Sequence, residues 1–344
     1  MANKIKVGVI GYGGQFNMAR AHLLQMSEAG MAPTAVAEIS SERLQAAAVD
    51  FPGIETYSSV SEMLKKSSVE LLAIVTPHNT HFALALQCLK AGRHVICEKP
   101  MAVTTSECDK LIATAAQQKV LLSAYHNRHW DGCILRAMDV VRRGNLGKII
   151  RIDLRMGNYG KPRDWWRSRK SISGGIFYDW GVHLLEYALQ VLQHQEDDLV
   201  EVTGYASQGY WSSHGHPYPK DANEDEAHAN VRFHSGAHLH LVISSIDSNM
   251  KPGLMEITGE KGSYVLDGLN WEHHYMQANG ALHVVRGKNP PSQPARFYQN
   301  INAHLTQGEK LIITPEWARL PVHILDLACQ SAERGKALPV KYTY

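Results

Sequence analysis

Short apolar runs separated by helix-length segments fill the first third of the chain and restrict it to few folds. The runs lie at residues 5–10, 34–37, 71–75, 94–97 and 120–124, and they carry few charged side chains. Strands buried on both faces of a parallel sheet have this composition, and the segments between them are long enough for crossover helices. The sequence therefore predicts a doubly wound α/β domain with a parallel sheet.

Beyond residue 125 the pattern changes to alternating apolar and polar positions. The alternation begins at 148–156, and in 227–234 the odd positions are apolar and the even ones polar. It continues through 237–243 after the turn dipeptide Ser235-Gly236, so we expect an antiparallel hairpin in a sheet with one open face. We interpret 270–302, with its prolines, as irregular connection and 315–334 as a closing helix. We expect two domains, 1–125 and 126–344.

Composition excludes several classes of protein. The 35 Lys and Arg side chains against 33 Asp and Glu give a net charge of +2, unlike the strongly basic surface of a nucleic-acid-binding protein. Apolar stretches are far shorter than the ~20 residues that cross a bilayer, and the N-terminal residues do not resemble a secretory leader. The 5 cysteines form no Cys-x-x-Cys pair, so they fit neither a disulfide framework nor a zinc knuckle. We expect a cytoplasmic protein without a membrane or nucleic-acid partner.

A glycine-rich turn follows the first predicted strand. Gly11 and Gly13 match the first glycines of Gly-x-Gly-x-x-Gly, in which backbone N–H groups approach a dinucleotide pyrophosphate closely. Phe16 occupies the third position, so either Ala19 supplies the small packing residue after a longer turn or the site is distorted. Glycines also mark ordinary turns, and this motif alone does not decide between the two interpretations.

An acidic residue ends the second predicted strand. Glu38 lies about the ~20 residues beyond the turn at which a carboxylate accepts hydrogen bonds from ribose hydroxyls. Ile39 follows it where an arginine could stand, so we expect no cation to compensate the charge of the carboxylate. Because a carboxylate repels a 2′-phosphate, the pattern favours NAD over NADP.

Candidate catalytic side chains lie after a strand and near the start of a helix. Lys99 follows the apolar run 94–97 at the edge of the sheet where doubly wound folds bind ligands. Asp179 and His183 are four residues apart in a predicted helix and share one face. A carboxylate one turn from a histidine fixes its tautomer and stabilises the imidazolium. The alternative is a capped helix end with a satisfied core histidine.

Taken together, the motifs resemble the glucose-fructose oxidoreductase, inositol dehydrogenase and rhizopine-catabolism (Gfo/Idh/MocA) family, from Lys4 to about Val340. The motifs, in order, are the glycine turn, Thr76-Pro77-His78-Asn79-Thr80-His81, Glu98-Lys99-Pro100, His126-Asn127-Arg128-His129-Trp130, Gly-Gly-(x)3-Asp-(x)3-His and Ile257-Thr258-Gly259-Glu260-Lys261-Gly262-Ser263. Departures from the family are Phe16, Glu38 where the family often has Asp, and the aromatic stretch at 165–167.

This resemblance implies a Rossmann domain followed by an α/β domain with a large, mostly antiparallel sheet. It also implies NAD(P)-dependent chemistry at a sugar or cyclitol carbon, with Lys99, Asp179 and His183 as catalytic residues. The first domain is expected to bind the cofactor through Gly11, Tyr12, Gly13, Gly14, Gln15, Phe16, Glu38, Thr76, Pro77, Asn79, His81, Glu98 and Lys99. The second domain is expected to bind substrate, with Asp179 and His183, and to form the oligomer. By their own chemistry Arg128 and Trp166 are further candidate substrate contacts, and interdomain packing is the alternative for each.

We therefore hypothesise an NAD-dependent dehydrogenase acting on a secondary hydroxyl of a sugar, cyclitol or related polyol, with His183 as general acid/base. One alternative is a hydrolase that retains NAD and oxidises its glycosidic substrate transiently. Another is a sugar- or nucleotide-sensing regulator without turnover. The open sheet suggests a homodimer or homotetramer. His214 and His216, and likewise His238 and His240, are not accompanied by a third ligand at zinc-site spacing, so we expect no metal.

Overall fold

The computed structural model describes residues 4–14, 16–193, 198–249, 251 and 253–340. Within this part of the chain it divides into two compact units. The first extends to Asn127 and includes Ala295–Leu320, and the second comprises Arg128–Pro294 and the residues from Pro321 onward. We describe each unit by itself.

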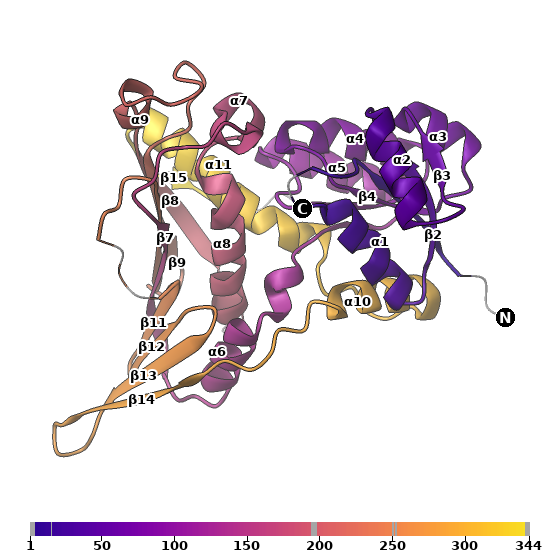
Figure 1. The fold of residues 1–344 in the computed structure, drawn as a ribbon. Coiled ribbons are helices and arrows are strands. Elements are labelled where there is room, and N and C mark those ends of the chain that lie inside the picture. Colours follow the sequence, from indigo (N-terminus) through magenta and orange to yellow (C-terminus); the bar gives the residue numbers. More distant parts are fainter. Residues whose placement is uncertain (1–3, 15, 194–197, 250, 252, 341–344) are drawn as a thin grey trace. The chain divides into compact units, whose positions relative to one another are not determined.

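A parallel sheet forms the centre of the first unit (Figure 1), and its strand order is β3-β2-β1-β4-β5-β6. The strands are β1 (Lys6–Ile10), β2 (Ala32–Ala37), β3 (Glu55–Tyr57), β4 (Leu71–Ile74), β5 (His94–Cys97) and β6 (Leu122–Ala124). Every residue of β4 and β6 is buried, as expected for strands covered on both faces. The sequence predicts each of these strands except β3, which has three residues and none of them buried.

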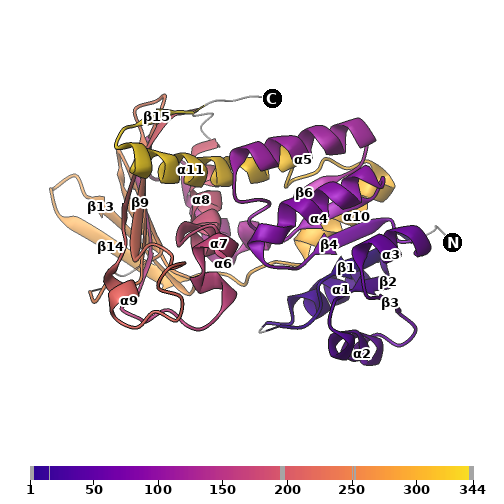
Figure 2. The ribbon, with the colours of Figure 1, turned by 90° about the horizontal axis from the view of Figure 1, so that it is seen from above.

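Helices connect these strands as crossovers. They are α1 (Met18–Glu28), α2 (Ser41–Asp50), α3 (Val60–Lys66), α4 (His78–Lys90) and α5 (Thr105–Gln118), and α4 and α5 lie side by side (Figure 2). The hydroxyls of Ser40, Ser59 and Thr104 cap α2, α3 and α5 by accepting backbone N–H groups of their first turns. These caps explain where the helices begin.

The second unit contains a sheet with strand order β14-β13-β12-β11-β7-β10-β9-β8-β15. The strands are β7 (Ile149–Gly157), β8 (Leu199–Ser207), β9 (Glu226–Phe233), β10 (His238–Ser244), β11 (Met255–Gly259), β12 (Gly262–Leu266), β13 (Asn270–Met276), β14 (Leu282–Lys288) and β15 (Leu338–Pro339). Strands β7 and β10 pair parallel, and the other described pairs are antiparallel. The expected fold class, a doubly wound parallel sheet with a second, mostly antiparallel sheet, is confirmed.

Helix α8 (Phe177–Gln193) runs along one face of this sheet and contacts β7 and β10 (Figure 2). The other helical segments of the unit are η1 (Asn127–Trp130), which begins at its boundary, α6 (Gly132–Arg142), η2 (Trp166–Ser168), α7 (Lys170–Ser173) and α9 (Tyr210–Ser213). The predicted hairpin is confirmed as β9 and β10, and in both strands buried residues alternate with more exposed ones. The predicted closing helix is confirmed as α11 (Pro315–Arg334), which crosses from one unit into the other.

The interpretation of 270–302 as irregular connection is wrong. This segment contains β13, β14 and the start of α10 (Arg296–Gln307). Neither strand has a buried residue, so the sequence carries no apolar alternation to reveal them. The prolines at 290, 291 and 294 lie between β14 and α10, where they interrupt only the connection.

Helix α10 packs in the first unit, although the sequence places it in the domain 126–344. Phe297 and Tyr298 are buried there, with the ring of Phe297 5.0 Å from that of Tyr125. Further along, the Ser123 hydroxyl donates to the Ile313 carbonyl at 2.8 Å, and Arg319 pairs with Asp109. The chain therefore returns to the first unit after β14. Among the described helices we find none with the length and apolar content needed to span a bilayer.

Candidate active site

The glycine turn connects β1 to α1 in a conformation that requires glycine. Gly11 has a φ of 87°, and a Cβ on it would lie 2.5 Å from the Val75 carbonyl oxygen. Helix α1 begins only at Met18, Ala19 in its first turn is buried, and Phe16 is 62% exposed. Of the two alternatives for the missing third glycine, the structure shows the longer turn. Gln15, also predicted to bind the cofactor, lies outside the described residues.

The Glu38 carboxylate ties this turn to the end of β2. It accepts the backbone N–H of Tyr12 at 2.8 Å and that of Ser40 at 3.0 Å, and it is 7% exposed. A carboxylate has about four acceptor positions, so positions remain for ribose hydroxyls. The Tyr12 phenol points elsewhere, donating to Asp50 at 2.6 Å. Burial, followed by the hydrogen bond to Asp50, raises the pKa of Tyr12 and keeps it protonated.

A cation that sequence reasoning missed lies beside Glu38. Arg43, on α2, has its Nη1 3.9 Å from Glu38 Oε2, and a Cβ on Gly13 would lie 3.2 Å from Arg43 Cδ. The neighbouring Ile39 is 93% exposed and takes no part in these contacts. Helical spacing could have suggested Arg43, because it lies in the first turns after the strand that ends in Glu38.

Lys99 lies in a turn after β5 that two buried histidines hold. His22 on α1 contacts the Glu98 carboxylate, with Nε2 3.0 Å from Oε1, and the other Glu98 oxygen accepts the Lys99 backbone N–H at 3.1 Å. The Lys99–Pro100 peptide is cis. His81 on α4 has Nδ1 2.7 Å from the Pro100 carbonyl oxygen, which ties the other end of the turn.

The second ring nitrogen of His81 reaches the turn after β4. Its Nε2 lies 2.8 Å from the Thr76 carbonyl oxygen. Burial lowers the pKa of His81, and the hydrogen bonds to the Pro100 and Thr76 carbonyls offset this only in part. The His81 ring therefore lies between the turn that carries Thr76 and the turn that carries Lys99, and it contacts a backbone carbonyl in each. Pro77 precedes α4, and Asn79 is exposed in its first turn.

The start of α8 depends on paired glycines and a carboxylate. Gly175 has a φ of 127°, and a Cβ on it would lie 2.8 Å from a carboxylate oxygen of Glu224. Glu224 accepts the Ile176 N–H at 3.0 Å and pairs with Lys170 at 2.7 Å. The negative charge at the helix N-terminus is favourable. This arrangement gives a physical reason for a Gly-Gly pair separated from Asp179 by three residues.

Asp179 and His183 lie on one face of α8, as predicted. His183 is 7% exposed, and its ring meets that of Trp180 edge-on at 5.7 Å between centroids. The Arg128 guanidinium lies over the same Trp180 ring, 4.8 Å from its centre. It also forms an ion pair with Asp131 at 3.0 Å. Arg128 therefore lies beside the residue that packs on His183.

Arg167 is a candidate site residue that sequence reasoning missed. Its Nε lies 3.2 Å from Asp179 Oδ1, and its guanidinium lies over Trp166 at 4.5 Å and over Trp165 at 5.0 Å from the ring centres. The aromatic stretch at 165–167 was visible in the sequence, but the pairing of its arginine with Asp179 depends on the fold of the connection between β7 and α8.

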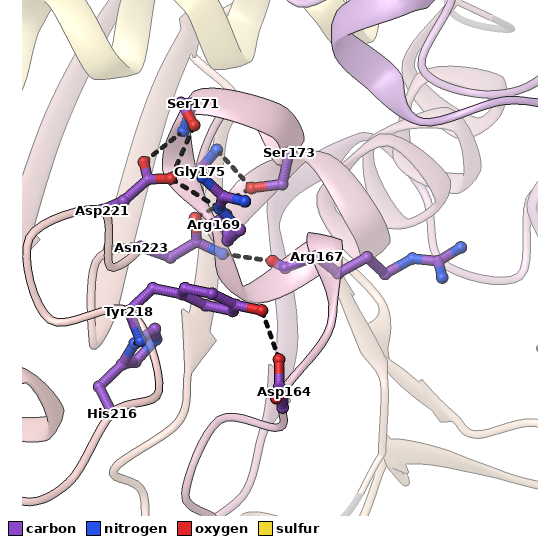
Figure 3. A network of polar contacts seen from close by, with 10 residues as sticks. All are labelled: Asp164, Arg167, Arg169, Ser171, Ser173, Gly175, His216, Tyr218, Asp221 and Asn223. Carbon is purple, nitrogen blue, oxygen red and sulfur yellow. Dashed lines mark hydrogen bonds and ion pairs between the residues drawn. The ribbon is translucent and has the colours of Figure 1, made fainter.

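A polar network holds this connection in place (Figure 3). Asp221 accepts the Ser171 N–H at 2.8 Å and its hydroxyl at 2.7 Å, and pairs with Arg169 at 3.0 Å. Asn223 donates to the Arg167 carbonyl at 2.7 Å. Figure 3 shows the Arg167 side chain pointing away from these contacts. The network therefore fixes the backbone of Arg167 and leaves its guanidinium for Asp179.

The histidines considered as metal ligands have other partners. His214 contacts the Tyr210 carbonyl at 2.7 Å, and His216 Nδ1 accepts the Tyr218 N–H at 2.9 Å. His238 and His240 lie on β10, where His240 approaches His228 at 3.3 Å. Within the described ranges, no group of three or more His, Cys, Asp or Glu side chains could hold a metal ion.

The first unit fits a dinucleotide. An ideal Cβ at Gly14 would meet no described heavy atom within 4 Å, so there is open space above the turn. The turn leads into α1, whose N-terminal N–H groups favour an anion. Glu38 retains acceptor positions, and Lys99 lies at the carboxyl end of the parallel sheet. The second unit adds a carboxylate, an imidazole and a guanidinium, which together can orient, accept and donate protons.

Comparisons with known proteins agree with this geometry. Residues 5–126 match the family described as "Oxidoreductase family, NAD-binding Rossmann fold", and 134–265 match the "GFO/IDH/MocA C-terminal domain". The scyllo-inositol 2-dehydrogenase (NADP(+)) of Bacillus subtilis is 23% identical over 371 aligned residues, 98% of this chain and 96% of that protein. The myo-inositol 2-dehydrogenase of Thermotoga maritima is 26% identical over 197 residues, 57% of each. The crystal structure of an NAD-binding protein from Listeria innocua shares the fold, with a TM-score of 0.81, 24% identity and coverage of 98% and 97%.

We predict that Asp221→Ala loosens the connection that carries Arg167. Ser171 loses its acceptor, so its amide hydrogen exchange, measured by mass spectrometry, should accelerate, whereas Asp247→Ala, which removes an exposed turn acceptor, should leave it unchanged.

Hydrogen bonds from Ser171, and then the charge of Arg169, lower the pKa of Asp221. The contribution of a carboxylate with a lowered folded pKa is present above its unfolded pKa of about 4 and lost as pH falls through the folded value. Protection of Ser171 should therefore persist from pH 7 to pH 5; its loss within that range would contradict the assignment.

Proposed function

Because the chain belongs to the Gfo/Idh/MocA family of oxidoreductases, we propose that it is an NAD-dependent dehydrogenase of a secondary hydroxyl on a sugar, cyclitol or related polyol. The observation that carries this proposal is that Asp179 and His183 lie one turn apart on one face of α8, with Arg167 held against the carboxylate. The inositol dehydrogenases among its relatives support the substrate class.

In this proposal His183 accepts the proton of the substrate hydroxyl as general base, and donates it in the reverse direction. Asp179 fixes the orientation of the imidazole and stabilises its positive charge. Lys99 donates a hydrogen bond to the reacting oxygen and stabilises the developing alkoxide, because its turn is fixed before reaction. A nicotinamide cofactor held in the first unit would supply the acceptor for the hydride of the carbinol carbon.

Substrate contacts are proposed for Arg128 and Trp166 as well. A guanidinium donates directional hydrogen bonds to hydroxyls, and an indole face packs against the C–H face of a sugar ring. Arg167 adds a donor next to Asp179 that could hold a second substrate hydroxyl. The cofactor contacts of Gly11, Gly13 and Glu38, and assembly into a homodimer or homotetramer through the second sheet, stay predictions.

The catalytic assignment predicts an order of effects on a substrate identified by screening cyclitols, aldoses and sugar acids with NAD. His183→Ala should lower kcat by about 10²- to 10⁴-fold, the contribution of a positioned acid–base group, while NAD still binds. Lys99→Met should also act mainly on kcat. Asp179→Asn should be milder than His183→Ala, because an amide still positions the ring but stabilises its charge less. His234→Ala, at an exposed turn, is the control. Near wild-type turnover in His183→Ala, with Asp179→Asn more damaging, would make His183 a core histidine.

The cofactor assignment rests on Glu38 and its neighbour Arg43. We propose that the wild type prefers NAD because the Glu38 carboxylate repels a 2′-phosphate and pairs with Arg43. Calorimetry should show tighter binding of NAD, and Glu38→Ala should narrow the difference by freeing Arg43. Adding Arg43→Ala to that variant should then weaken NADP binding roughly tenfold, the effect of one charge-assisted hydrogen bond of about 1.5 kcal/mol. Lys66→Ala, a distant exposed cation, should change neither affinity. Tighter NADP binding by the wild type would show that Glu38 does not face the ribose.

A further inference from the structure

A buried chain of polar side chains runs from α10 to the turn that carries Lys99. Tyr298 on α10 donates to His22 Nδ1, and His22 Nε2 lies 3.0 Å from Glu98 Oε1. Both Tyr298 and His22 are 0% exposed. Helices α1 and α10, which supply them, are far apart in sequence but in contact within the first unit (Figure 1).

The direction of each hydrogen bond follows from the partners. Burial raises the pKa of Tyr298 well above its usual range, so it keeps its proton and donates. Burial raises the pKa of Glu98, but the hydrogen bond from His22 and the positive charge of Lys99 lower it further, so Glu98 is ionised and only accepts. A neutral His22 with its proton on Nε2 satisfies both neighbours.

This series of hydrogen bonds ends on the backbone of Lys99. The second oxygen of Glu98 accepts the Lys99 N–H at 3.1 Å, so the carboxylate joins helix α1 to the peptide bearing the lysine. Aromatic rings enclose the imidazole, with Tyr125 4.2 Å and Tyr298 5.8 Å from it between ring centres. The Glu98 side chain is 14% exposed, so its carboxylate is mostly withdrawn from water. Withdrawing a carboxylate from water is costly, and apolar residues of similar volume often stabilise a core equally well. A contribution to folding stability alone therefore does not explain why these three polar side chains are linked in the interior of the unit.

We propose that Tyr298, His22 and Glu98 form a hydrogen-bond chain that positions Lys99 for its role in the reaction. His22 and Tyr298 are positioning residues, because they act on Lys99 through Glu98 and touch neither substrate nor cofactor. The inference rests on the proposed function for the role of Lys99. The positioning itself is a property of the protein without ligand.

The test compares hydroxyl and imidazole deletions within one core. Tyr298→Phe removes the first donor and His22→Leu removes the middle of the chain, whereas His22→Gln supplies an amide N–H for Glu98 and an oxygen for Tyr298. Tyr125→Phe is the matched control, because it deletes a neighbouring hydroxyl that donates to Gln25 outside the chain. The readouts are hydrogen exchange of the Lys99 amide, kcat, NAD affinity by calorimetry and the unfolding midpoint.

We expect His22→Leu and Tyr298→Phe to accelerate Lys99 amide exchange by about 2- to 10-fold, equivalent to one net hydrogen bond. They should lower kcat by about 10- to 100-fold, as a misplaced catalytic group does, with NAD affinity nearly unchanged. His22→Gln should restore much of the protection of the Lys99 amide and much of the wild-type kcat. Tyr125→Phe should resemble the wild type in both measurements.

Unchanged Lys99 exchange in both chain variants, or an equal effect of Tyr125→Phe, would overturn the proposal. If His22→Leu does not fold, Tyr298→Phe, which removes a single oxygen, gives the decision. Accelerated exchange combined with full turnover in Lys99→Met would instead refute the proposed role of Lys99 while the positioning stands. The two failures are therefore distinguishable.

Discussion

The carboxylate of Glu98 connects the architecture of the first unit to its chemistry. It lies directly after β5, and its oxygens join the imidazole of His22 on α1 to the backbone N–H of Lys99. A buried carboxylate is tolerated only when hydrogen bonds and nearby charges compensate its lost hydration. Helix α10 returns to the first unit and supplies Tyr298, which completes the contacts of His22.

Carboxylates play a similar organising part elsewhere. Glu38 joins the glycine turn to β2 and the start of α2, and Glu224 binds the first N–H groups of α8. In each case a single side chain holds loop backbone whose donors would otherwise need water. Apolar burial builds the sheets and helices, and these carboxylates set the loops that carry the candidate site residues.

Local patterns in the sequence predicted the fold class well, because buried parallel strands and half-exposed antiparallel strands leave clear signatures. The strands β13 and β14 left none, since neither buries a side chain, and the three residues of β3 were too few. Helix α10 was missed because prolines precede it and its buried face is short.

The candidate site divides in the same way. Lys99, Asp179 and His183 could be selected from spacing and resemblance, because each lies in a recognisable motif. Arg43 could have been suggested by helical spacing, because it lies 5 residues after Glu38. Arg167 and His22 could not, since their partners are 12 and 76 residues away and the pairings depend on how loops and helices pack. No periodic pattern records such contacts.

The proposed reaction is the transfer of a hydride from a polyol carbon to a nicotinamide. Mass spectrometry of the products from a substrate deuterated at the reacting carbinol carbon tests it most directly. The account predicts one deuterium in the reduced nicotinamide for each ketone formed, with the non-deuterated form reacting faster. Release of a sugar with no deuterium in the nicotinamide and no net NADH would contradict it and favour a hydrolase that uses oxidation only transiently.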